Sequence, residues 1–385
     1  MSTSNFSILL PELLTNIITY LSPQHLTGNA GLKYVASLNT KYKNVIFELL
    51  EHSFLQLYVS YNNIYKVKHY TISGISFSID SMSTVGYEQI TNDEINNLNI
   101  SSYNYVSIHF GINLSIPSVF TLFNNLKGLE LIHVNICDAD LQLEQFSNLE
   151  TLIIHEGSRL TDNAFRNLKH LIHLEIKNCN LISDVGLEYC QKLQSLCINN
   201  CDITDESLGT LKFLTTLKLY CCCSVDGSSF SKMKYLTELC IESCNIQEKY
   251  LQIPTLHTLK LLNCSHITGT ILIHLPKLRT LYISISNISD IELSQLTQLT
   301  TLMLCACYNI TDNGLKTLYS LKVLQLSNND NITANAFISL TQLQHLVVHY
   351  IKNIRKRTSV VYLNNKMIYK SFGQFNMPHY FNYEI

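Results

Sequence analysis

Cysteine is the residue type whose number and spacing in this sequence could most readily support chemistry. The chain has 385 residues and 13 cysteines, three of them consecutive at positions 221–223. Two further pairs, Cys197/Cys201 and Cys240/Cys244, are separated by three residues each. Neighbouring thiols can bind a metal ion, form a disulfide or act as a redox switch. Each of these needs sulfur atoms that converge, so the elements that position the cysteines decide the question.

Most of the cysteines belong to a regular repeat. A template with apolar residues at offsets 0, 3 and 5 and a small, Cys or Asn residue at offset 8 recurs at intervals of 20 to 23 residues. The repeats start at Leu126, Leu149, Leu171, Leu193, Leu214, Leu236, Leu256, Leu278, Leu299, Leu321 and Leu343, and weaker copies start at Val67 and Tyr103. Offset 8 is cysteine at Cys179, Cys201, Cys222, Cys244, Cys264 and Cys307. Such a period predicts a stack of units, each stable only against its neighbours.

Each repeat predicts one strand followed by a short outer helix. Side chains at offsets 3 and 5 point into the core, and those at offsets 2, 4 and 6 point to the opposite, concave face. After the strand come Ser/Thr-Asp pairs, in which either residue could cap a helix. The pairs are Thr161/Asp162, Ser183/Asp184, Thr204/Asp205, Ser289/Asp290 and Thr311/Asp312. A Leu or Phe three residues beyond the Asp, such as Phe165 or Leu208, is expected to return to the core.

The repeat favours a structural role for the cysteines. Offset 8 turns inward after the strand, where a small, weakly polar side chain can pack near backbone. Offset 4 faces the other way, so the sulfurs of Cys197 and Cys201 should not converge. The sequence has no C-x-x-C or zinc-finger spacing and no phosphate-binding glycine loop, H-E-x-x-H or G-x-S-x-G motif. We therefore expect no metal ion, no cofactor, no catalytic residue and no enzymatic activity.

Composition narrows the choice of partner and compartment. The net charge is −2 and the isoelectric point is about 6.7, which argues against nucleic acid or an anionic membrane as a partner. No apolar run reaches the ~18 residues of a membrane span, and the first residues lack the basic region of a signal peptide. Many cysteines without an export signal indicate reduced thiols, so we expect a cytoplasmic or nuclear protein.

The N-terminal region predicts a helix with one apolar face. In residues 8–21 apolar side chains recur at spacings of three and four, and Pro11 suits a first helical turn. A second helical stretch is predicted over about residues 37–54. Together these helices could shield the first repeat, or they could form a separate binding domain.

Two known patterns meet in this chain. The repeat is the leucine-rich-repeat signature L-x-x-L-x-L-x-x-N/C, in its cysteine-containing form. Residues 9–21 resemble the opening of an F-box, roughly L-P-x-E-L-L-x-x-I-x-x-x-L: Glu12, Leu13, Leu14 and Ile17 match, and Pro11 is one place late. Residues 35–46 resemble its closing helix after a few extra residues around 27–32. The chain thus resembles the F-box/leucine-rich-repeat family, the substrate receptors of Skp1–cullin–F-box ubiquitin ligases.

The resemblance implies an architecture and a set of partners. The fold would be α/β: a leucine-rich-repeat solenoid, shaped like a horseshoe, behind a small α-helical F-box-like domain. The domains would be residues 1–50 (F-box-like), 51–102 (linker and cap with a degenerate repeat), 103–354 (about eleven repeats) and 355–385 (C-terminal cap). A Skp1-like adaptor, the cell's own or a host's, would link the chain to a cullin. Its predicted contacts are Leu10, Pro11, Leu13, Leu14, Ile17, Ile18 and Leu21.

The concave face is the predicted site for a target protein. Neighbouring strands are ~4.8 Å apart, so side chains at one offset form continuous rows. The predicted contacts are Glu175, Lys177, Lys218, Tyr220, Glu242, Lys260, Leu262, Tyr282 and Met303. Leu262, Tyr282, Ile285, Met303 and Cys305 are expected to form an exposed apolar strip, which is typical of a binding site. The alternative is a scaffold without an F-box, whose N-terminal helices only cap the repeats.

Overall fold

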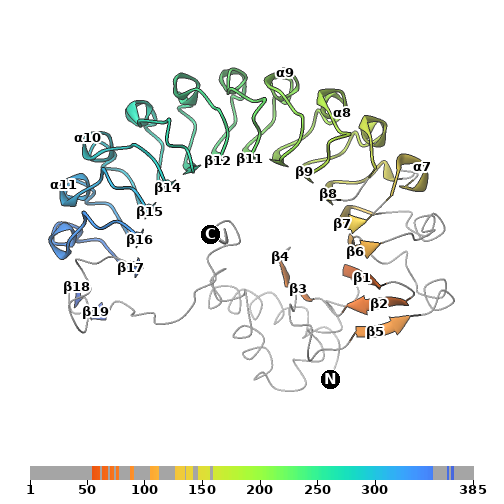
Figure 1. Ribbon diagram of the computed structural model, residues 1–385, viewed down its shortest axis with the longest axis horizontal. Helices are drawn as coiled ribbons and strands as arrows, with labels where there is room; N and C mark the ends of the chain where they lie inside the picture. The colour runs from red at the N-terminus through yellow and green to blue at the C-terminus, as the bar shows by residue number, and fades with distance from the viewer. Residues whose placement is uncertain are drawn as a thin grey trace, which may run out of the picture. The chain divides into compact units, whose positions relative to one another are not determined.

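The computed structural model describes residues 54–60, 63–67, 70–72, 75–77, 87–90, 105–111, 126–134, 136–141, 146–156, 159–349, 362–363 and 366–367 (Figure 1). The chain divides into two compact units, Met1–Leu181 and Ile182–Ile385, which we call unit 1 and unit 2. The predicted F-box-like helices and adaptor contacts lie outside the described residues.

Unit 2 is a stack of parallel strands, one from each repeat. The strands are β10 (Ser195–Asn199), β11 (Thr216–Tyr220), β12 (Glu238–Glu242), β13 (Thr258–Leu262), β14 (Thr280–Ser284), β15 (Thr301–Cys305), β16 (Val323–Ser327) and β17 (His345–His349). Each strand pairs with the next in the sequence and aligns residues of the same offset, such as Leu196, Leu217 and Leu239. Two short antiparallel strands, β18 (Tyr362–Leu363) and β19 (Lys366–Met367), follow.

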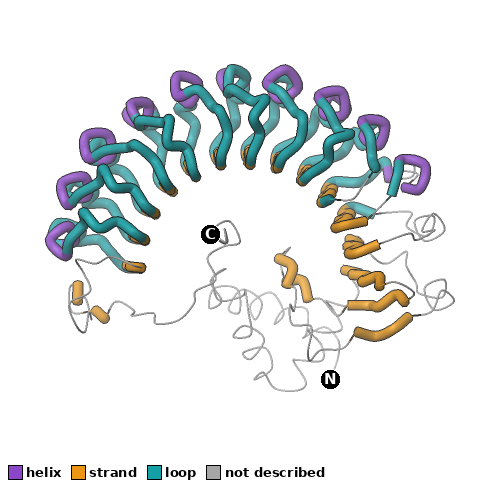
Figure 2. The backbone as a smooth tube through the Cα atoms, viewed as in Figure 1, coloured by secondary structure: helices purple, strands orange, loops and turns teal. Residues whose placement is uncertain are grey.

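A short helix follows most strands on the outer side of this unit, and the strands line its inner side (Figure 2). The α-helical turns of unit 2 are α8 (Asp184–Glu188), α9 (Asp205–Leu208), α10 (Asp290–Leu293) and α11 (Asp312–Leu315). The 3-10 turns are η5 (Phe230–Lys232), η6 (Glu248–Leu251), η7 (Thr270–His274) and η8 (Ala334–Phe337). The predicted leucine-rich-repeat fold is thus confirmed.

The leucines of the template form a continuous core. In the repeat of β11, for example, Leu214, Leu217 and Leu219 are all fully buried. The Leu or Phe beyond each Asp is buried as predicted, including Phe165, Leu187, Leu208, Leu293 and Leu315. Because every strand carries the same set, the hydrophobic effect stabilises the repeats only when they are stacked.

The two residues of each Ser/Thr-Asp pair form different hydrogen bonds. The Ser or Thr caps its own helix, as when the Thr204 side chain accepts from the Glu206 N–H. The carboxylate instead accepts hydrogen bonds from the next repeat: Asp290 Oδ1 and Oδ2 lie 2.7 and 2.5 Å from the backbone nitrogen and hydroxyl oxygen of Thr311. In unit 2, acidic side chains at the equivalent position (offset 12 or 13) also make such bonds, from Asp184, Asp205, Glu248 and Asp312. We call these five residues the carboxylate ladder.

Two repeats have glycine where the ladder has an acid. Gly227 and Gly269 both have φ 92°, and a side chain at Gly269 would come within 2.8 Å of Ile288. Without a carboxylate at Gly269, Ser289 is bonded within its own repeat, where Glu292 accepts from its backbone N–H and hydroxyl. A capping box within the next repeat can therefore replace the hydrogen bonds of a missing ladder carboxylate.

The described part of unit 1 starts with strands that do not follow the repeat. They are β1 (Phe54–Ser60), β2 (Asn63–Val67), β3 (Tyr70–Ile72), β4 (Ile75–Phe77) and β5 (Tyr87–Ile90). Strand β2 pairs antiparallel with β1 and β5, and β3 pairs antiparallel with β4. The weak copy starting at Val67 is therefore not a repeat strand: the antiparallel pair of β3 and β4 occupies its place.

The repeats of unit 1 begin at the copy that starts at Tyr103. Its strand β6 (Tyr105–Gly111) pairs in parallel with β1 and with β7 (Gly128–Val134). Then follow α7 (Asp138–Leu141), β8 (Thr151–His155), η4 (Asp162–Phe165) and β9 (His173–Lys177). Strands β7, β8 and β9 are parallel and align like offsets, as in unit 2.

Candidate functional site

The six cysteines at offset 8, which we call the cysteine ladder, pack between adjacent repeats. Each offset-8 cysteine of the six points back to the carbonyl two residues earlier, at 3.2 to 3.4 Å. Most of these thiols also approach a carbonyl of the preceding repeat, as Cys307 approaches Ile283 O at 3.6 Å. Asn329 replaces cysteine at this offset and donates to Leu304 O and Ser327 O. Offset 8 therefore links the backbones of adjacent repeats, with thiol or amide alike.

Burial makes some of these thiols less reactive. Burial raises the pKa of Cys264 and of Cys307 to about 12. All 13 cysteines are free thiols, and Cys223 of the triplet is exposed. In the part of the chain that the structure describes, no three His, Cys, Asp or Glu side chains are grouped so as to hold a metal ion. Cys264 and Cys307 are thus neutral packing groups at physiological pH, whereas the hydrogen bond from Cys222 lowers the pKa of Cys244.

The inner face is the sheet surface formed by offsets 2, 4 and 6, and on β10 to β13 it is filled by its own side chains. Cys197, Tyr220, Cys240 and Leu262 form one cluster with exposed fractions of 2 to 7%. The Cys240 thiol donates to the Tyr220 hydroxyl at 3.7 Å, and burial raises the pKa of Cys240 to about 11. Glu242 is 5% exposed. Tyr220, Glu242 and Leu262 thus lie on the predicted face but offer a partner little surface, and the expectation that Leu262 is exposed is wrong.

Lys260, on the inner face of β13, contacts side chains of both neighbouring strands, β12 and β14. Its ammonium lies 3.3 Å from Glu238 Oε1 and 5.1 Å from the ring centroid of Tyr282. Lys218, which aligns with Cys240 on the next strand, is half-buried. The two predicted lysines are therefore on the face, and the cation of Lys260 is held between an anion and an aromatic ring.

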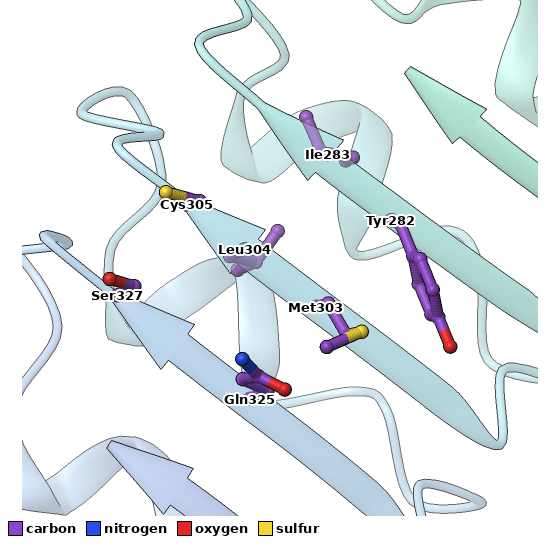
Figure 3. A pocket seen from close by; sticks show the side chains of 7 residues that line it. All are labelled: Tyr282, Ile283, Met303, Leu304, Cys305, Gln325 and Ser327. Carbon is purple, nitrogen blue, oxygen red and sulfur yellow. The ribbon is translucent and has the colours of Figure 1, made fainter. Parts of the chain in front are cut away.

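A shallow hollow lies on β14, β15 and β16. Tyr282, Met303 and Gln325 stand side by side on the three strands, and Cys305 and Ser327 lie nearer the strand ends (Figure 3). The core residues Ile283 and Leu304 also line it. None of the inner-face side chains of these three strands carries a formal charge. The hollow thus offers sulfur, aromatic and amide groups, which suit an uncharged side chain of a partner.

The apolar strip predicted from the sequence is displaced toward this hollow. Ile285 is 50% exposed, whereas Tyr282, Met303 and Cys305 are half-buried. Ile285 also has a left-handed backbone with φ 49°. A β-branched residue is disfavoured in that conformation. Gln325 and Ser327 align with Met303 and Cys305 at offsets 4 and 6, but they are not among the predicted contacts.

The inner face of unit 1 carries several charged side chains. Glu175 Oε1 lies 2.7 Å from His155 Nε2, and Lys177 Nζ lies 3.6 Å from Glu156 Oε1. These predicted contact residues are half-buried, and ion pairs of such exposure add little to stability. Unit 1 therefore presents charged groups on its inner face that are paired with one another.

Comparisons with known proteins agree with the fold. No protein-family model and no curated protein matches this sequence. Among solved structures, an internalin (inlF) from Listeria monocytogenes is 24% identical with a TM-score of 0.50, over 70% of this chain and 79% of that one. A chain of the mouse RP105/MD-1 complex is 19% identical with a TM-score of 0.48, over 64% of this chain and 46% of that one. This chain has the leucine-rich-repeat fold. None of its described helices is long and apolar enough to cross a membrane.

Proposed function

We propose that this chain is a non-catalytic receptor that holds a target protein against the inner face of its repeats. The uncharged hollow on β14 to β16 carries the proposal. Solvated sheet faces are usually polar, and a hollow lined by Tyr282, Met303 and Gln325 is the kind of surface that an interface covers. The charged side chains before it, such as Lys218 and Lys260, would fix the orientation of the target.

The finer proposal is that the chain recruits this target to a ubiquitin ligase. Residues 1–50 would dock on a Skp1-like adaptor through Leu10, Pro11, Leu13, Leu14, Ile17, Ile18 and Leu21, and the adaptor would bring a cullin. The support is the F-box resemblance of residues 9–21 together with the cysteine-containing repeats that accompany F-boxes in that family. The chain would act by raising the effective concentration of a target lysine near the ubiquitin-loaded enzyme, in the cytoplasm or nucleus.

The rival is a scaffold that binds its target without a ligase. In that case the N-terminal helices only cover the first repeats. Both proposals share the inner face, so only the adaptor distinguishes them.

Co-purification tests the ligase proposal. Full-length chain is expected to retain Skp1, and a variant lacking residues 1–50 is expected to lose it. The double substitution Leu13→Asp and Leu14→Asp should act like the deletion, because charged groups cannot occupy an apolar docking face. Absence of Skp1 from the full-length chain, or equal retention by the deletion variant, would leave the scaffold as the function.

A further inference from the structure

The two edges of the unit 2 sheet differ in charge, although the net charge of the chain is close to zero. One edge is formed where the chain enters each strand, at offsets −2 to 1, and the other where it leaves, at offsets 7 to 13. In the eight repeats of unit 2 the entry positions hold six Lys or Arg and no Asp or Glu. In the seven repeats that start at Leu193 to Leu321 the exit positions hold eight Asp or Glu and one Lys, whereas those of the last repeat hold three Lys or Arg and lie outside the described residues. We call the first the basic edge.

Backbone hydrogen bonds place the basic side chains in adjacent repeats. Thr215 N donates to Gln194 O and Thr237 N to Thr215 O, both at 2.8 Å. The same bond continues from His257 N to Thr237 O and from Arg279 N to His257 O, at 2.8 and 2.9 Å. Residues just before these positions therefore lie one repeat apart along the edge. The exposed cations are Lys192, Lys212, Lys234, Lys277, Arg279 and Lys322.

Three large aromatic rings are exposed on the basic edge, and two of them lie in neighbouring repeats; the third is Tyr319. Phe213 and Tyr235 are 55% and 59% exposed, and they occupy the same offset in neighbouring repeats. Each directly follows a lysine, Lys212 or Lys234. Exposed aromatic groups in neighbouring repeats beside cations are characteristic of a binding surface and not of a merely solvated one.

We propose that the basic edge binds a segment of a protein partner in which acidic and apolar side chains alternate. The lysines complement carboxylates, and the rings of Phe213 and Tyr235 cover the apolar side chains between them. The composition favours a peptide over nucleic acid. A single strand of nucleic acid stacks its bases on successive aromatic groups, whereas the next repeats place Thr255 and Lys277 at this offset. Five of the six cations are lysines, which lack the bidentate geometry with which arginine recognises phosphate. This surface is separate from the inner face, and its partner need not be the target held there.

A fluorescence binding assay on the full-length chain tests the proposal. The probe is a labelled short peptide in which Glu alternates with Phe and Leu. Its affinity should fall as salt is raised, since the charges are exposed. The variant K212E/K234E should bind about tenfold more weakly, because attraction becomes repulsion at two adjacent positions. The variant F213S/Y235S should also weaken binding at unchanged charge.

Two controls make the test decisive. The variant K249E/K316E changes the net charge by the same amount, away from the basic edge, and should bind the peptide like the parent. Equal weakening by this control, or no binding by the parent, would overturn the proposal. A single-stranded oligonucleotide or phosphatidylserine vesicles bound more tightly than the peptide, with the same dependence on Lys212 and Lys234, would overturn it in favour of that ligand. Self-association abolished by K212E/K234E would assign the edge to a second copy of the chain.

Discussion

The carboxylate ladder and the inner face of unit 2 belong to the same repeats but differ in how much their side chains vary from one repeat to the next. Along the ladder an acidic side chain meets the backbone N–H of the next repeat, whether it is Asp184, Glu248 or Asp312. On the inner face no two successive strands carry the same set of side chains, and the exposed chemistry changes from lysines to the uncharged hollow. Positions that hold the same residue type in most repeats are constrained by the stacking of the repeats, whereas positions whose residue type varies are available for recognition.

Breaking the ladder should have the largest effect on stability. Asp205 accepts from the backbone N–H groups of Asp226, Gly227 and Ser229 and from the Ser229 hydroxyl, at 2.6 to 3.2 Å. Asp205→Ala leaves these part-buried donors without an acceptor and should lower the free energy of unfolding by about 2–4 kcal/mol. Urea denaturation measures this loss.

Asp202→Ala is the matched control for Asp205→Ala. Asp202 is exposed and lies three residues earlier in the same turn. Its removal should change stability by less than about 0.5 kcal/mol. Similar losses in both variants would mean that the acidic character of the turn matters and the ladder does not.

A charge placed in the hollow should leave stability nearly unchanged and weaken recognition. Met303 is half-buried on β15, so the carboxylate of Met303→Glu would still be reached by water in the free protein. Proteins retained by the parent chain should bind at least about tenfold more weakly, because the interface would bury an unpaired carboxylate. Quantitative affinity purification beside thermal unfolding separates the two effects.

The ladder should also give part of the acid sensitivity of the protein. Burial alone would raise the pKa of Glu248, but hydrogen bonds from Thr268, Thr270 and Ile271 outweigh it and lower the pKa. A carboxyl with a lowered folded-state pKa stabilises the fold above its unfolded pKa of ~4.3. That stabilisation is lost as the pH falls through the folded value. The parent should thus exceed Glu248→Gln in stability at neutral pH, and the difference should shrink below about pH 4.

A second substitution checks that the effect belongs to this contact. Thr268 donates to Glu248 from both its backbone N–H and its hydroxyl, at 2.8 and 2.9 Å. Glu248→Gln in a Thr268→Val background should therefore cost less than in the parent. Additive losses in the two backgrounds would place the pH dependence elsewhere.

The sequence predicted what repeats and missed what depends on neighbours. The spacing of leucines located the core, and the Ser/Thr caps and the inward cysteines followed from the same period. The ladder could not be seen, because Asp290 bonds to Thr311 across a repeat boundary and its alternative role as a cap reads identically in the sequence. The burial of Leu262 was missed because alternation assigns a face, while exposure depends on Tyr220 and Cys240 packing beside it. The strand Phe54–Ser60 was missed because it lies outside the repeat.

The smallest predicted effect concerns Ile285, which lies at offset 7 between the inner-face strand and the turn that carries the carboxylate ladder. Offset 7 is left-handed in every repeat from the one starting at Leu126 to the one starting at Leu321, and Asn occupies it at Asn178, Asn200, Asn263 and Asn328. Ile285 is the single β-branched residue among these positions. Ile285→Asn should stabilise the chain by about 0.5–1 kcal/mol, because Asn tolerates this conformation and Ile does not. If Ile285 contacts the partner of the neighbouring hollow, the same substitution weakens retention of that partner. Greater stability with undiminished binding would mean that Ile285 does not contact the partner. A loss of stability would show that its side chain packs within the turn.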